Sequence, residues 1–156
     1  MSAARKVNRI VVHCSAGPAG QRGKDIAAWH TRSASRGGLG WSAPGYHYVV
    51  EADGIVVRIL PEDRIANGAK GYNRDSIHVC YTGGIDSRGN PSDTRTAAQK
   101  GSLLRLISGI RGRLGNLKVV GHRDLSPDLD GDGVISPWER IKACPCFDAI
   151  PEYGGG

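Results

Sequence analysis

The chain has 156 residues, which is enough for one domain with a buried core, and its 39% hydrophobic and 23% charged residues are typical of a globular protein. No apolar run approaches the roughly 18 residues of a membrane span, and the N-terminus leads directly into a short apolar stretch. We therefore expect neither a membrane span nor a cleaved secretory signal.

The net charge of +6 is unevenly distributed along the chain. Residues 124–139 contain five acidic residues and no Lys or Arg, which leaves +11 on the rest of the chain. A basic body favours an anionic partner such as nucleic acid, an anionic glycopolymer or a membrane surface. Charge alone does not choose among these partners.

Short apolar runs separated by turn signals predict about five strands. The expected strands cover residues 8–13, 46–51, 55–60, 77–82 and 117–121. Ala52-Asp53-Gly54 predicts a hairpin turn between the second and third of them. The glycine-rich connection from Gly37 to Gly45 is irregular for a compact domain, which is typical of a functional loop.

Two or three helices are expected between and after these strands. A short helix over residues 25–30 has Asp25 as its cap, the longest helix is capped by Ser92 or Asp93, and a last short helix starts at Ser136. The longest helix ends near Leu114-Gly115. Its expected buried stripe consists of Leu103, Ile107, Ile110 and Leu114. Its expected solvated faces carry Arg95, Lys100, Arg105 and Arg113. The chain is thus predicted to form one α/β (mixed α+β) domain, a central mixed β-sheet of about five strands flanked by two or three helices.

Four cysteines are too few for a disulfide scaffold in a chain that can build its own core. The spacing of Cys144-Pro145-Cys146 makes a disulfide between those two residues strained. We therefore expect free thiols, with one thiolate available to a metal. Cys14 and Cys80 are most simply small buried hydrophobes.

Two of the five histidines, His13 and His122, lie at the carboxyl ends of predicted strands. This edge of an α/β sheet is a common place for a site, and a sheet holds such side chains rigidly. Together with a downstream thiolate they form a donor set for zinc that leaves the fourth position open for water, as in catalytic sites. On spacing alone, Cys144 and Cys146 are both candidates for the thiolate.

Six short motifs occur in a characteristic order along the chain. They are Ile10–Ser15, Gly45–Val50, Ala69–Asn73, Ser76–Cys80, Gly121–Asp124 and Lys142–Pro145. In this combination the sequence resembles the type-2 N-acetylmuramoyl-L-alanine amidases, closest to their phage lysozyme branch, over most of its length. The same superfamily includes the peptidoglycan recognition proteins.

This resemblance implies a zinc-dependent peptidoglycan amidase that hydrolyses the amide bond between N-acetylmuramic acid and L-alanine of the stem peptide. It implies zinc on His13, His122 and Cys144, and catalytic assistance from Tyr46 and Lys142. The implied role is that of a phage or prophage endolysin, made in the cytoplasm and acting on the bacterial cell wall after release. The expected partner is the muropeptide stem of peptidoglycan, with no nucleic acid, and the chain is expected to be a monomer.

An acidic insert at residues 128–139 departs from the phage lysozymes that the chain resembles. Its twelve residues match an EF-hand loop, with carboxylates at positions 1, 3, 5 and 12 and glycine at position 6. The predicted ligands of a structural calcium ion are Asp128, Asp130, Asp132, the Val134 carbonyl and Glu139. Ser136-Pro137-Trp138-Glu139 is also a good capping box, so a plain acidic loop followed by a capped helix remains the alternative.

A second departure is Asn67-Gly68, where phage relatives often have a histidine before Ala69. Of the remaining histidines, His47 is expected to face away from Tyr46, and neither His30 nor His78 is expected to be a ligand.

Two other functions compete with the amidase. One is a non-catalytic peptidoglycan-binding recognition module, against which Cys144 counts because such modules lose the cysteine ligand. The other is a zinc-stabilised nucleic-acid-binding protein, which lacks support from any basic helix interleaved with aromatics.

Overall fold

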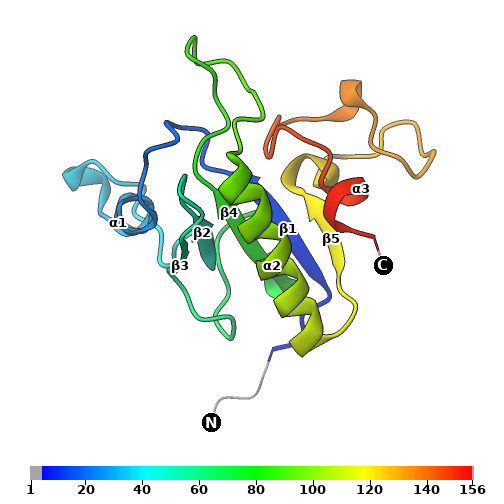
Figure 1. Ribbon diagram of the computed structural model, residues 1–156, viewed down its shortest axis with the longest axis horizontal. Helices are drawn as coiled ribbons and strands as arrows, with labels where there is room; N and C mark the ends of the chain where they lie inside the picture. Colours follow the sequence, from blue (N-terminus) through cyan, green and yellow to red (C-terminus); the bar gives the residue numbers. More distant parts are fainter. Residues whose placement is uncertain (1–4, 156) are drawn as a thin grey trace.

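One mixed β-sheet organises the computed structural model, which describes residues 5–155 (Figure 1). Its strands lie in the order β3-β2-β4-β1-β5. Their bounds are Arg9–Cys14 for β1, Tyr48–Val50 for β2, Val56–Arg58 for β3, Ser76–Tyr81 for β4 and Lys118–Gly121 for β5. β1 pairs in parallel with β4 and β5, β2 pairs in parallel with β4, and β3 runs antiparallel to β2 through the predicted hairpin. The predicted mixed sheet of five strands is confirmed.

Three α-helices flank the sheet: α1 (Gly23–Thr31), α2 (Ala97–Leu114) and α3 (Ala149–Tyr153). In Figure 1, α2 crosses one face of the sheet, and α3 lies beside it near β5. α1 contacts β2 and β3. No helix in the described part of the chain is both long and apolar enough to cross a membrane.

Alternation along the central strands separates an apolar face from a more polar one. Ile10 and Val12 of β1 and Ile77 and Val79 of β4 are fully buried in the main core, against α2 and α3. The residues between them point to the opposite face, because successive side chains of a strand alternate. That face carries His13 and two β4 residues, His78 and Cys80, and its small apolar cluster includes Ile26 of α1. The histidines therefore lie on the sheet face away from the main core.

The longest helix begins later than the sequence predicts. Its N-cap is Thr96 rather than Ser92 or Asp93: the Thr96 hydroxyl accepts from the Gln99 backbone N–H at 3.0 Å, and the Gln99 side chain accepts from the Thr96 N–H at 2.9 Å. The buried Gln99 amide also donates to the carbonyl oxygens of Val50 and Thr82. Since these bonds link the helix to β2 and to the residue that follows β4, tertiary contacts select Thr96 as the N-cap over the upstream candidates. Leu114, expected in the buried stripe, is 43% exposed at the helix end.

Arg95 was expected on a solvated helix face, and that prediction is wrong. It precedes α2, its side chain is only 2% exposed, and it forms ion pairs with Asp93 at 2.8 Å and with Glu152 of α3. Its guanidinium carbon lies 3.4 Å from the centre of the Phe147 ring. Two carboxylates and a ring face compensate the buried charge, which thereby links the C-terminal helix to the start of α2.

Smaller differences concern the helix ends. α1 starts after Arg22, and Asp25 lies in its first turn rather than capping it. The helix predicted from Ser136 is a single 3₁₀ turn, Pro137–Glu139, with Ser136 as its N-cap. α3 was not predicted, because five residues with a proline carry little helical periodicity.

We expect Arg95→Ala to destabilise the fold by about 3 kcal/mol, which lowers Tm by roughly 10 °C, because it removes a buried cation and its ring contact. Arg113→Ala is the matched control, since Arg113 is 55% exposed and forms a surface ion pair with Glu62; it should cost less than about 1 kcal/mol. Thermal unfolding of both variants measures the difference. Equal losses would show that the Arg95 network contributes no more than a surface ion pair.

Candidate active site

The parallel pairing of β1 and β5 brings two histidines together. Val12 is in register with Gly121, so His13 near the end of β1 and His122, which directly follows β5, lie side by side at the same edge of the sheet. Their ring centroids are 4.7 Å apart. His13 is 1% exposed and His122, in a short 3₁₀ turn, is partly buried.

Cys144 reaches this edge from the C-terminal segment. Its carbonyl oxygen accepts from the Arg123 N–H at 2.8 Å, and its Sγ accepts from the Cys14 N–H at 3.1 Å. Gly121 permits this approach, because a Cβ there would lie 2.7 Å from Cδ of Pro145. One ligand atom each of His13, His122 and Cys144 lies within 4.8 Å of the others.

These three residues fit zinc by the chemistry of their donors. Imidazole nitrogen and thiolate sulfur are ligands that zinc prefers, and three protein donors leave one tetrahedral position open. An open cavity of about 430 Å³ adjoins them, lined also by Tyr46 and Lys142. The donor set and the cavity together are those of a catalytic rather than a structural metal site.

Burial keeps both imidazoles neutral. It lowers the pKa of His13 well below its usual value, with further lowering by the neighbouring His78 and His122. Burial lowers the pKa of His122 to about 4, and the ammonium of Lys142 adds to this shift. A neutral imidazole offers the lone pair that metal coordination needs. Hydrogen bonding to Cys14 and burial raise the pKa of the Cys144 thiol, so its proton must leave when a metal binds.

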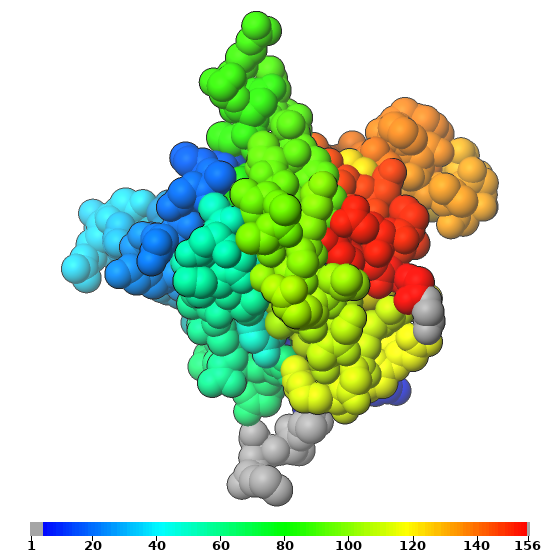
Figure 2. Space-filling model, in the orientation of Figure 1, coloured from blue at the N-terminus to red at the C-terminus, as the bar shows by residue number. Residues whose placement is uncertain are grey.

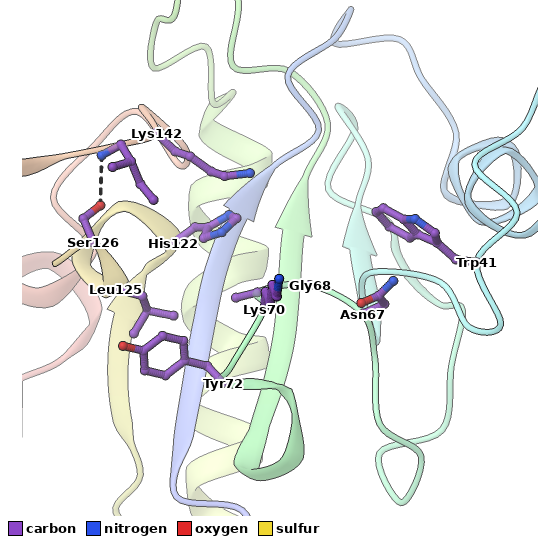
Figure 3. Close-up of a pocket in the computed structure, with 11 residues that line it drawn as sticks. Trp41, Asn67, Gly68, Lys70, Tyr72, His122, Leu125, Ser126 and Lys142 are labelled. Atoms are coloured by element: carbon purple, nitrogen blue, oxygen red, sulfur yellow. Dashed lines mark hydrogen bonds between the residues drawn. The ribbon is translucent and has the colours of Figure 1, made fainter.

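Tyr46 and Lys142 border the same cavity. The Tyr46 ring lies 5.0 Å from that of His13, and its hydroxyl lies 3.5 Å from the Cys14 carbonyl oxygen. Burial raises the pKa of Tyr46, so its hydroxyl remains a donor at neutral pH. Lys142 is exposed, and its side chain extends along the rim of the neighbouring pocket near His122 (Figure 3).

A second pocket of about 290 Å³ continues the cavity (Figure 3). Trp41, Gly68, His122 and Lys142 line both. Trp41 comes from the glycine-rich connection that the sequence marked as functional, although the sequence did not single out this residue. The other residues of the second pocket are Asn67, Ala69, Lys70, Tyr72, Leu125, Ser126 and Ile141. The two hollows form one continuous groove beside the three candidate ligands.

The remaining histidines and cysteines lie around this centre. His30 accepts a hydrogen bond from the Gly45 N–H at 2.9 Å, and His47 accepts one from the His78 N–H at 3.0 Å. Both rings therefore stabilise the backbone of a neighbouring segment. Cys80 is fully buried. All four thiols are free, and Cys146 Sγ lies 4.0 Å from Cys14 Sγ. Cys14 is buried but contacts both C-terminal thiols, so it is more than a small hydrophobe.

The acidic insert forms a second cluster of candidate ligands, separate from the first. One carboxylate oxygen each of Asp128, Asp130, Asp132 and Glu139 lies within 4.8 Å of the others. Asp128 accepts from the N–H groups of Gly131 and Gly133, at 3.0 and 2.8 Å, and Glu139 is only 2% exposed. The insert, in orange, projects from the body of the molecule (Figure 2).

Comparison with known proteins supports the same family along almost the whole chain. The sequence model of the N-acetylmuramoyl-L-alanine amidases matches residues 3–145. The endolysin of Klebsiella phage KP32 is 33% identical over 148 residues, which cover 92% of this chain and 83% of the relative.

Solved structures show the same fold at lower identity. The amidase LysC of Clostridium intestinale superposes with a TM-score of 0.69 at 22% identity, covering 95% of this chain and 82% of that one. PGRP-LB of Drosophila superposes with a TM-score of 0.65 at 18% identity, covering 90% and 75%. The family model covers all five strands and the three candidate zinc ligands and ends before α3. Since a relative is also over 30% identical across most of the chain, the protein belongs to the N-acetylmuramoyl-L-alanine amidase family.

Proposed function

We propose that this protein is a zinc-dependent peptidoglycan amidase that hydrolyses the amide bond between N-acetylmuramic acid and L-alanine of the stem peptide. The observation that carries the proposal is the cluster of His13, His122 and Cys144 beside an open groove, in a member of the amidase family. The proposed role is that of a phage or prophage endolysin, a name borne by the relative from Klebsiella phage KP32. Such an enzyme acts on the bacterial cell wall after its release from the cytoplasm.

When bound, zinc would act as a Lewis acid and would lower the pKa of a water molecule toward neutral pH. The residues of the chain supply the rest. The Lys142 ammonium at the rim stabilises negative charge that develops on the amide oxygen. The Tyr46 hydroxyl, kept protonated by burial, orients the attacking water or passes a proton to the leaving amine. The groove beside them holds the stem peptide.

A binding-only peptidoglycan recognition module is the second candidate, favoured by the likeness in fold to the peptidoglycan recognition proteins LCa and LCx, whose ectodomain complex was solved with bound tracheal cytotoxin. The two functions differ in what they require of the site. Binding needs only the groove, whereas hydrolysis needs a metal with an open position. The presence of Cys144 beside both histidines favours the enzyme.

We also propose that the acidic insert binds a structural calcium ion through Asp128, Asp130, Asp132, the Val134 carbonyl and Glu139. The EF-hand spacing and the convergence of the four carboxylates support this. A hard divalent cation relieves the repulsion among them. Because the insert lies between His122 and Cys144 in the chain, calcium would order the segment that carries the proposed thiolate ligand.

Digestion of purified peptidoglycan tests the reaction. The wild-type protein should release free stem peptides and leave the glycan intact, as read by mass spectrometry. Tyr46→Phe and Lys142→Ala should each lower turnover by about 10² to 10³, since each removes one donor from the reacting groups. Disaccharide products would identify a glycosidase instead, and variants as fast as wild type would show that these side chains are not catalytic.

Metal analysis tests the ligands. The purified chain should hold about one zinc, and Cys144→Ala should lose most of it because only two of three protein donors remain. Cys146→Ala is the matched control, two residues away, and should keep its zinc. The reverse pattern would assign the thiolate to Cys146.

Thermal unfolding tests the calcium site, with zinc held constant. Millimolar calcium should raise the Tm of the wild-type protein by roughly 5 °C or more relative to chelator, because the ion binds only the folded loop. Asp132→Ala should abolish this rise. An unchanged Tm, with no calcium detected by titration calorimetry, would leave the insert as an acidic loop with a capped 3₁₀ turn.

A further inference from the structure

A third histidine lies directly behind the proposed zinc site. His78, on β4, is fully buried, and its Nδ1 lies 2.8 Å from Nε2 of His13. The two ring centroids are 5.0 Å apart. The other nitrogen of His78, Nε2, is one of three buried side-chain polar atoms without a hydrogen-bond partner in the described part of the chain. Among the described residues, His13 is therefore the only group bonded to the His78 ring.

The hydrogen bond has a defined direction when His13 holds a metal. Nδ1 of His13 faces Cys144, with its Sγ at 3.9 Å, so this nitrogen provides the lone pair to the shared ion. The hydrogen of a neutral His13 ring then resides on Nε2 and is donated to Nδ1 of His78. His78 in turn carries its own hydrogen on Nε2, the atom that lacks a partner. A buried N–H without an acceptor opposes folding, so stability alone does not account for this arrangement.

The surroundings hold His78 in this place. Its backbone N–H donates to Nδ1 of His47 at 3.0 Å, and the two rings lie parallel, 6.1 Å apart with an interplanar angle of 5°. Gly68 provides the room, because a Cβ at that position would lie 2.5 Å from Nδ1 of His78. A side chain at residue 68, such as the histidine that phage relatives often have, would therefore collide with His78 of β4.

We propose that His78 is a positioning residue that accepts a hydrogen bond from His13 and thereby holds its ring and tautomer ready for the metal. The inference rests on the proposed zinc site. Groups that accept a hydrogen bond from a metal-bound histidine orient its ring and raise its basicity, and their loss typically weakens metal binding by about 10- to 100-fold. In this protein an imidazole takes the place of the usual carboxylate, carbonyl or water.

The test compares zinc dissociation constants, measured by competition with a chromophoric chelator, for four purified proteins. They are the wild type, His78→Ala, His78→Asn and Val79→Ala. His78→Ala removes the acceptor, whereas the Asn amide oxygen can occupy a position close to that of Nδ1. Val79→Ala is the matched control: it removes buried atoms from the same strand, on the opposite face of the sheet, without touching His13.

We expect His78→Ala to bind zinc about 10- to 100-fold more weakly and to change the visible absorption bands of the cobalt-substituted protein. His78→Asn should recover most of the affinity and the wild-type bands. Val79→Ala should lower the Tm of the metal-free protein and leave the dissociation constant unchanged. These readouts do not depend on amidase activity.

Wild-type affinity in His78→Ala, or equal weakness in His78→Asn and His78→Ala, would overturn the positioning role and leave the zinc site intact. A wild-type chain that binds no zinc would overturn the zinc proposal and this inference together. A loss of affinity in Val79→Ala as large as in His78→Ala would show that general destabilisation, not the hydrogen bond, weakens the site.

Discussion

The parallel pairing of β1 with its two neighbours is the constraint on which the rest of the structure depends. Parallel strands end at the same edge of a sheet, so residues that follow corresponding positions become neighbours whatever their separation in sequence. The register of Val12 with Gly121 places His13 beside His122, and that of Val11 with His78 places a third imidazole behind them. Because β1 is buried on both faces, slippage of this register would move apolar side chains onto the polar face.

The division of the sheet into two faces gives the candidate site its electrostatics. The main core takes the apolar residues of β1 and β4 under α2, which leaves the opposite face free for histidines. Burial there lowers the pKa of His13, His78 and His122 and keeps the rings neutral. The rings of His78 and His122 can then both contact that of His13 without repulsion between positive charges. The same neutrality supplies the lone pairs that a metal requires.

The C-terminal segment completes the site through contacts that are remote from it. Arg95 binds Glu152 and covers Phe147, which fastens the end of the chain against α2. The Arg123 N–H and the small size of Gly121 then allow the Cys144-Pro145 backbone to approach β5. The thiol therefore reaches the histidines because the folding of the C-terminal segment is coupled to the main core.

Sequence by itself determined the five strands, the hairpin, the position of the long helix and the identity of the histidines at the strand ends, because alternation, turn residues and strand-end position are local signals. Its motif order also indicated the family that comparison confirmed. Only the tertiary structure decided the start of α2 at Thr96, the burial of Arg95 and the contact of His78 with His13. Each of these depends on a partner far away in the chain, whose position is set by strand register and packing rather than by local propensity.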